Sequence, residues 1–298
     1  MARHFLRLTD LSAAEARSVV DRAIALRARP DPSHRPFVGK TLAMIFMKNS
    51  TRTRVSFESG MARFGGHALF LQAGSTQLGR DEPISDTAKV ISRMCHAIMI
   101  RNDSHADQVE LAAHSRAPVV NGLSELHHPC QLLADIQCWI EHRGDPKGKV
   151  AAWIGDGNNV CHSWIDAARL FDFTLRIATP PGFEPKADIV ASGGKHIEVV
   201  ANAKAAATGA DIVITDTWTS MGQEAETQRR LKAFANYCVD AALMAHAKPD
   251  AIFQHCLPAH RGEEVTAEVI DGPQSVVWDE AENRMWAQMA LLEFLLAT

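Results

Sequence analysis

Short apolar runs alternate with amphipathic stretches along the chain, and this pattern predicts strands and helices in turn. Residues 41–47 form a nearly continuous apolar run, which is typical of a strand buried on both faces of a parallel sheet. Apolar residues then recur at helical spacing from Val55 to Phe64. Further strands are predicted at 69–71, 97–100, 118–120, 150–154, 175–178, 197–200, 211–214, 251–253 and 275–278. Further helices are predicted at 9–29, 86–94, 105–115, 129–142 and 285–296.

The alternation restarts after a turn-forming stretch at 144–148, which contains two glycines and a proline. Repeated strand–helix units in both halves predict an α/β fold of two doubly wound parallel-sheet domains, with the active site in the cleft between them. We expect the domains to span 1–143 and 144–282, with the C-terminal helix 283–298 packing back on the first domain.

Polar clusters follow the predicted strands directly, where a parallel α/β sheet binds its ligands. These clusters are 50–53, Arg101, His128, 155–159, 216–221 and 255–256. The stretch 48–54 combines three hydroxyls with three cations at a predicted helix start, an arrangement that favours a phosphate. Taken alone, such a stretch is more often a solvated and well-capped helix start. Six clusters at strand ends are difficult to explain by solvation alone.

Composition limits the function. The chain has 298 residues, 46% of them hydrophobic, and a formal net charge of -4, which argues against a nucleic-acid-coating surface. No apolar run is long enough to span a bilayer, and the N-terminus carries no signal-peptide pattern. The six cysteines form no Cys-x-x-Cys pair, so structural zinc is not expected and free thiols are. We therefore expect a cytoplasmic protein that binds neither nucleic acid nor membrane.

Three further motifs are ambiguous when taken singly. The glycine turn at 155–159 is not a dinucleotide fingerprint, because Val160 stands where a third glycine is needed, and its asparagines could present an amide to a carboxylate or an amine. In the stretch 216–222, an acid could bind a cationic group while a hydroxyl and backbone N–H groups bind a carboxylate. Cys256 and His128, each alone, are more often structural residues.

Together these motifs resemble, in order, those of the aspartate/ornithine transcarbamylase family. They are Ser50-Thr-Arg-Thr-Arg54, His128-Pro-Cys-Gln131, Asp216-Thr-Trp-Thr-Ser-Met-Gly222 and His255-Cys-Leu-Pro258. The first two resemble motifs shared across the family, whereas the last two and the stretch 155–159 resemble its ornithine branch. The resemblance runs from His4 to the closing stretch 280–286.

The resemblance implies transfer of a carbamoyl group from carbamoyl phosphate to the δ-amine of L-ornithine, giving L-citrulline and phosphate in arginine biosynthesis. It implies no metal and no organic cofactor, and a homotrimer in which Gln77 reaches the active site of a neighbouring subunit. Two alternatives stay open: a sibling enzyme that uses acetylornithine, succinylornithine or putrescine, and an inactive phosphate-binding or regulatory homologue.

The same resemblance assigns the site residues. Carbamoyl phosphate is expected to contact Ser50, Thr51, Arg52, Thr53, Gln77, Arg101, His128, Pro129, Cys130, Gln131, Cys256, Leu257 and Arg284. Ornithine is expected to contact Asn159, Asp216, Ser220 and Met221. Catalytic roles are implied for Arg101, His128, Gln131 and Cys256. Cys256 and the departing phosphate are both candidate acceptors of the amine proton, whereas Asp216 is expected to hold and orient the substrate.

Overall fold

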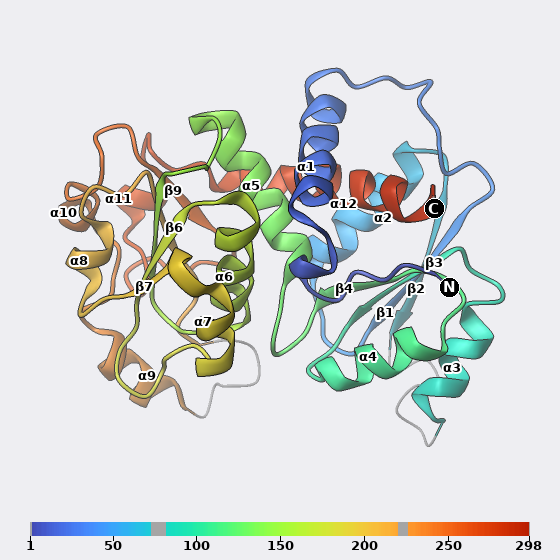
Figure 1. Cartoon of the computed structure of the whole chain (residues 1–298), viewed down its shortest axis with the longest axis horizontal. Helices are drawn as coiled ribbons and strands as arrows, with labels where there is room; N and C mark the ends of the chain where they lie inside the picture. Colours follow the sequence, from blue (N-terminus) through green and yellow to red (C-terminus); the bar gives the residue numbers. More distant parts are fainter. Residues whose placement is uncertain (1, 73–81, 220–225, 298) are drawn as a thin grey trace. The chain divides into compact units, whose positions relative to one another are not determined.

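The computed structural model describes residues 2–72, 82–219 and 226–297. The chain divides into two compact units, Met1–Gln137 with Glu282–Thr298, and Cys138–Ala281 (Figure 1). The division falls inside two helices, α5 (Pro129–Arg143) and α12 (Val277–Leu296). The domain limits and the cleft expected from the sequence stay predictions.

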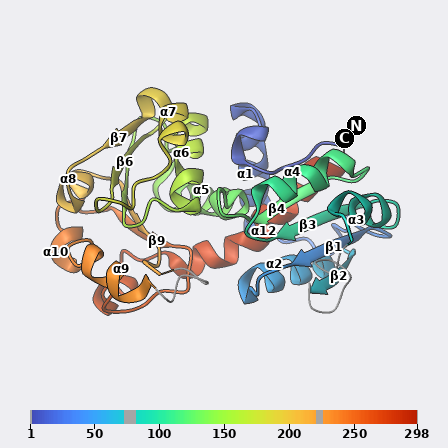
Figure 2. The ribbon, with the colours of Figure 1, turned by 90° about the horizontal axis from the view of Figure 1, so that it is seen from below.

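A four-stranded parallel sheet in the order β2-β1-β3-β4 forms the centre of the first unit (Figure 2). Its strands are β1 (Thr41–Phe46), β2 (His67–Gln72), β3 (Ala97–Arg101) and β4 (Val119–Leu123). The central strands β1 and β3 are almost wholly buried, as a continuous apolar run requires. The chain winds from β1 to β2 on one side and then to β3 on the other. The carboxyl ends of β1 and β3 therefore form a topological switch point, where ligands of such sheets bind.

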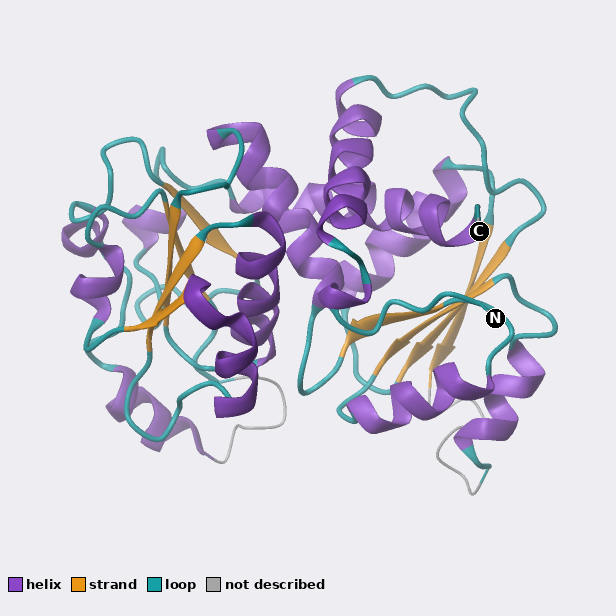
Figure 3. Ribbon diagram, viewed as in Figure 1, coloured by secondary structure: helices purple, strands orange, loops and turns teal. Residues whose placement is uncertain are grey.

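Helices cover both sides of this sheet (Figure 3). They are η1 (Leu8–Asp10), α1 (Ala13–Ala28), α2 (Thr51–Arg63), α3 (Ile84–Ile91), α4 (His105–His114), the first part of α5 and most of α12. Serine side chains at Ser12, Ser50 and Ser104 cap α1, α2 and α4 by accepting a backbone N–H bond. On one face of the sheet, alternate residues such as Ala43 and Ile45 form an apolar cluster with residues of α3 and α4.

The second unit contains a five-stranded parallel sheet in the order β7-β6-β5-β8-β9. Its strands are β5 (Val150–Ile154), β6 (Thr174–Ala178), β7 (Ile197–Val199), β8 (Ile212–Thr215) and β9 (Ile252–His255). The winding direction reverses between β5 and β8. The loops after these two strands therefore diverge at a second switch point.

The helices of the second unit also lie on both sides of their sheet. They are α6 (Asn159–Phe171), α7 (Ala187–Gly193), η3 (Gly194–His196), α8 (Ala203–Ala207), α9 (Thr227–Phe234), α10 (Ala241–Met244) and α11 (Ala267–Ile270). Residues of α8, α10 and α11 share one apolar cluster with β5, β8 and β9. None of the helices in the described ranges is long and apolar enough to cross a bilayer.

The predicted α/β class with two parallel sheets is confirmed. The strand predicted at 275–278 is wrong, because Ser275 makes only an isolated bridge to Phe253 and α12 already begins at Val277. The apolar run was too short to distinguish a strand from a helix start. Asp279 and Glu280, acids in the first turn of α12, favour the helix. The closing helix is accordingly longer than predicted.

We predict that Gln288→Met stabilises the protein. Gln288 is fully buried on α12, and neither atom of its amide has a hydrogen-bond partner in the part of the chain that the structure describes. Methionine keeps the shape and removes the unsatisfied groups, so the free energy of unfolding should rise by about 1–2 kcal/mol. The midpoint of thermal or urea unfolding measures this.

Gln137→Met is the matched control. Gln137 is equally buried, but its amide donates a hydrogen bond of 3.1 Å to Asn283 Oδ1. The same substitution should here lower the unfolding midpoint. A lowered midpoint in both variants would contradict the account of Gln288.

Candidate active site

In the first unit, polar side chains converge on the hydroxyl of Thr53 in the first turn of α2. Ser50 caps the helix, and its Oγ lies 3.1 Å from Thr53 Oγ1. The guanidiniums of Arg101, at the end of β3, and Arg284, on α12, donate to the same oxygen at 3.4 and 2.8 Å. The side chains of Thr53, Arg101 and Arg284 are nearly inaccessible to solvent. Two buried cations therefore lie at a helix N-terminus, which is itself favourable for an anion.

The three cations of the stretch 48–54 lie in different surroundings. Lys48 pairs with Asp103 at 2.5 Å, and Arg54 pairs with Glu58 at 3.0 Å. Within the described ranges, Arg52 makes no hydrogen bond and no ion pair. Arg52 is therefore the cation of this stretch whose charge remains available to a ligand.

His128 lies between β4 and α5 and is buried. Burial holds its pKa well below the ordinary value, and the charges of Arg284, Arg101 and Arg52 lower it further. The imidazole is therefore neutral at pH 7. It can donate a hydrogen bond to a carbonyl oxygen without adding a charge to the site.

The start of α5 supplies the remaining predicted residues of this cluster. Pro129 is the first residue of the helix, a position where proline fits well. Gln131 is buried and donates its amide to Asp135 Oδ1 at 2.8 Å. The Cys130 thiol donates to the carbonyl of Asn121, and burial raises its pKa to about 12. Cys130 is consequently not a nucleophile.

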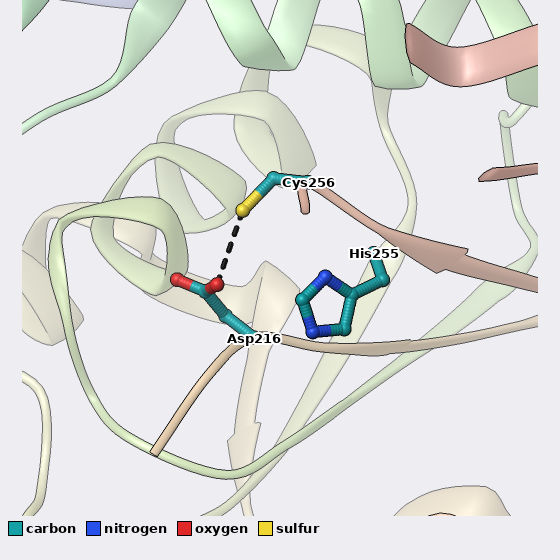
Figure 4. Close-up of side chains that lie close together, drawn as sticks. All are labelled: Asp216, His255 and Cys256. Carbon is teal, nitrogen blue, oxygen red and sulfur yellow. Dashed lines mark hydrogen bonds between the residues drawn. The ribbon is translucent and has the colours of Figure 1, made fainter. Parts of the chain in front are cut away.

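In the second unit, a carboxylate lies at the switch point between β5 and β8 (Figure 4). Asp216 follows β8 and is 5% exposed. Its Oδ1 accepts from the Cys256 thiol, which follows β9, at 3.1 Å and from the Thr217 amide at 2.8 Å. Its Oδ2 accepts from the Asn158 amide, which follows β5, at 2.7 Å. Three strand ends thus meet at one carboxylate.

Hydrogen bonds fix the tautomer of His255, the residue before Cys256. Its Nδ1 accepts from the Leu257 backbone N–H at 2.9 Å, so the ring proton lies on Nε2, which faces Glu264 Oε1 at 3.1 Å. Glu264 is fully buried and also accepts from the His260 amide at 2.6 Å. Burial raises the pKa of this carboxyl, but the hydrogen bonds from His255 and His260 outweigh that effect and hold it below the ordinary value. Glu264 is therefore a carboxylate at pH 7.

This network shapes the loop that carries Cys256. The Glu280 carboxylate accepts from the His255 backbone N–H at 2.9 Å. Leu257 has a φ of +58°, a conformation that costs a residue other than glycine free energy and persists only when the surroundings enforce it. The hydrogen bonds at His255 supply this constraint, and the Cys256 thiol then points at Asp216 (Figure 4).

Groups that can ligate a metal also meet here. Single ligand atoms of Asp216, His255 and Cys256 lie within 4.8 Å of one another. The hydrogen bonds just described already use these atoms, and no second observation on the described residues points to an ion.

Comparison with known proteins gives a family match for each of the two parts of the chain that carry these clusters. Residues 3–141 match the carbamoyl-P binding domain of the aspartate/ornithine carbamoyltransferases, and residues 147–295 match their Asp/Orn binding domain. The chain belongs to the aspartate/ornithine carbamoyltransferase family. The family inferred from the sequence motifs is confirmed.

Similar proteins include several within this carbamoyltransferase family. An ornithine carbamoyltransferase of Methylococcus capsulatus is 60% identical over 294 residues, covering 99% of this chain and 98% of the relative. The crystal structure of ornithine carbamoyltransferase from Burkholderia thailandensis is 50% identical, with a TM-score of 0.91 and coverage of 99% and 98%. The structure titled anabolic ornithine carbamoyltransferase from Campylobacter jejuni is 42% identical, with a TM-score of 0.92 and coverage of 98% of both chains.

The predicted site residues of this carbamoyltransferase lie in the first unit, in the second unit, or outside the described residues. Residues of the first unit, including Arg101, His128 and Arg284, surround the start of α2. In the second unit Asp216 and Cys256 meet, whereas Asn159 begins α6 and its carbonyl accepts from Ser163. The predicted residues Gln77, Ser220 and Met221 lie outside the described residues.

Sequence reasoning missed the acids that support these residues, namely Asp135, Glu264 and Glu280. Each is almost inaccessible to solvent. Nothing in the sequence distinguishes them from the surface acids around them. Asn158 donates its amide to Asp216 Oδ2 within the protein, and the functional interpretation of the 158–159 amides stays a prediction.

Proposed function

We propose that this chain is an ornithine carbamoyltransferase, which transfers the carbamoyl group of carbamoyl phosphate to the δ-amine of L-ornithine and forms L-citrulline and phosphate. The observation that carries the proposal is a pair of buried clusters: arginines at a helix N-terminus at one switch point, and a carboxylate with neutral donors at the other. The first suits a phosphate and the second suits an amino acid. A relative that is 60% identical to this chain bears the name of this activity.

Carbamoyl phosphate is held by its phosphate at the N-terminus of α2, where Arg52 and Arg101 add charged donors. Arg284 and Arg101 both donate to Thr53 Oγ1, and this common acceptor holds the two guanidiniums at the N-terminus of α2. His128 and Gln131 direct neutral donors at the carbonyl oxygen. Attack by an amine develops negative charge on that oxygen, so fixed donors stabilise the transition state more than the ground state.

Ornithine presents its amino-acid end to Asp216. The δ-amine has a lysine-like pKa of about 10.4, so well under one percent is neutral at pH 7. The site must therefore favour the neutral amine and provide an acceptor for the proton lost on attack. The two candidate acceptors are Cys256 and the departing phosphate. The phosphate can accept the proton directly, whereas Cys256 can accept it only as a thiolate, and in this structure its thiol donates to Asp216. Asp216 stabilises cationic forms, so it orients the substrate and does not take this proton.

We further infer an anabolic role in arginine biosynthesis, in the cytoplasm. The 42% identical enzyme from Campylobacter jejuni is named an anabolic ornithine carbamoyltransferase, which supports the direction. The residues that follow His255-Cys-Leu-Pro258 resemble those of biosynthetic members of the family.

The chain is also proposed to form a homotrimer in which Gln77 completes a neighbouring active site. The segment that carries Gln77 directly follows β2, which is an edge strand of its sheet. Two apolar side chains are exposed here, Leu69 on β2 and Val55 on α2. An edge strand with no further strand beside it in the described residues, next to apolar side chains, suits association with another copy. Sedimentation velocity should give three times the chain mass of 32.6 kDa, and a monomer mass at micromolar concentration would contradict the trimer.

The function is tested by carbamoylation of a panel of amines. Ornithine, acetylornithine, succinylornithine and putrescine are each incubated with the protein and labelled carbamoyl phosphate, and the products are separated. We expect citrulline as the dominant product. A dominant product from another amine would favour a sibling enzyme, and the absence of any product would favour the inactive homologue.

Two substitutions separate the roles of the clusters. Arg52→Ala should raise the KM for carbamoyl phosphate by about a hundredfold, because it removes a charged hydrogen-bond donor worth about 3 kcal/mol. Asp216→Ala should act mainly on the KM and kcat/KM for ornithine. Initial-rate kinetics with both substrates varied measure the division.

Arg54→Ala is the matched control for Arg52. It removes the same charge from the same helix turn, but Arg54 is paired with Glu58. Its effect on carbamoyl phosphate should be several times smaller. Equal effects of Arg52→Ala and Asp216→Ala on both substrates would refute the division of the site.

A further inference from the structure

Arg230 is a buried cation in the second unit that the proposed chemistry does not use. It lies on α9, and its side chain is only 5% exposed. The guanidinium Nε donates to the backbone carbonyl of Trp218, and a terminal nitrogen forms an ion pair with the Asp156 carboxylate. It also lies over the ring of Phe183, 4.8 Å from the centroid. Burial of such a cation is costly unless each contact is kept.

The two partners of Arg230 belong to the two loops that form the carboxylate cluster. Trp218 is two residues after Asp216, and Asp156 is two residues before Asn158. One guanidinium therefore fastens the loop after β8 to the turn after β5. The hydrogen bond between Asn158 and Asp216, 2.7 Å long, joins the same two loops at their functional ends.

Neighbouring contacts make this connection stiff on both sides. The Trp218 ring stacks on Phe234 of α9, with centroids 5.6 Å apart and planes inclined by 23°. On the other loop, the indole of Trp153 donates to the Asp156 carbonyl at 2.9 Å. Gly157 follows Asp156, and a Cβ there would lie 2.1 Å from the backbone nitrogen of Pro185. Arg230 thus connects two short segments, 216–218 and 156–158, that are each held by further contacts.

We propose that Arg230, acting with Asp156, is a positioning residue for ornithine binding, because it holds Asp216 and Asn158 in register across the switch point. This inference rests on the proposed function for its substrate. Arg230 touches neither of these side chains, and its effect is transmitted through the backbone of the two loops.

The ion pair also predicts a dependence on pH. Burial raises the pKa of Asp156 to about 6, the charge and hydrogen bond of Arg230 oppose that rise, and the charge of Asp216 adds to it. Cys161 on α6, a thiol with a pKa well above the ordinary value, also faces Asp156 and stays neutral. Glu226 lies 3.8 Å from Arg230. Above about pH 6 Asp156 is charged and the ion pair is complete, and below it the carboxyl is protonated and the pair is lost.

The experiment compares Arg230→Met, Arg230→Lys and Asp156→Asn with the wild-type enzyme. Arg230→Met should raise the KM for ornithine about tenfold or more while the KM for carbamoyl phosphate stays within about twofold. Arg230→Lys keeps the charge and should recover part of the loss. In the wild type, protonation of the δ-amine already lowers kcat/KM for ornithine as the pH falls, and loss of the ion pair should steepen this fall below about pH 6. Asp156→Asn should lack the additional steepening.

Arg229→Met is the matched control, since Arg229 is an exposed neighbour on α9 that also lies over Phe183. It should change neither KM. Equal increases in both KM values, the same effect from Arg229→Met, or an unchanged ornithine KM in Arg230→Met would overturn the proposal. If Arg230→Met does not fold, Arg230→Lys and Asp156→Asn decide it through the ornithine KM and the pH profile.

A readout without activity separates this inference from the proposed function. Hydrogen exchange followed by mass spectrometry should show faster exchange in the peptides 212–219 and 155–160 of Arg230→Met than of Arg229→Met. A wild-type protein that forms no citrulline would refute the proposed function, and the exchange comparison would still test whether Arg230 fixes the two loops. Unchanged exchange in both peptides would refute the inference.

Discussion

The constraint on which the site depends is the reversal of winding in each parallel sheet. Loops that follow adjacent strands normally turn to the same side, but those after β1 and β3, and those after β5 and β8, turn apart. The gap leaves room for side chains from several strand ends. Thr53 accepts hydrogen bonds from several side chains in one unit, and Asp216 does so in the other. Arg101, Asp216 and Cys256 follow strands of these sheets, whereas Arg284 reaches the first switch point from α12.

The fold was largely readable from the sequence because its central strands are continuous apolar runs. Residues 150–154 were predicted with the limits that β5 has, since the run is bounded by turn residues. The strand prediction at 275–278 was wrong, because four residues are too few to show a strand or helix periodicity and the acids that follow belong to the first turn of a helix. Local patterns identify an element when it is long or clearly bounded, and they are ambiguous otherwise.

The site was predictable only in part, and for a different reason. Residues that contact a substrate recur in motifs, so Arg52, His128 and Asp216 could be named from the sequence. The residues that support the site are separated in sequence from their partners: Glu264 lies nine residues from His255, which it orients, and Arg230 lies 74 residues from Asp156. Such pairs become visible only when the fold brings them together. A single sequence contains no pattern that links them.

The two clusters differ most in how their charges are balanced. In the first, Arg101 and Arg284 lie at the N-terminus of α2, and Arg52 makes no ion pair with the described residues, so the cluster favours a dianion. In the second, the described donors to Asp216 are an amide, a thiol and a backbone N–H, all of them neutral. Neutral donors orient a carboxylate without cancelling its charge, which remains available to a cationic ligand. A buried arginine bonded directly to Asp216 would orient it equally well and would cancel that charge. Arg230 lies one loop away from the carboxylate, so it can order the site while leaving the charge of Asp216 free for an ammonium group.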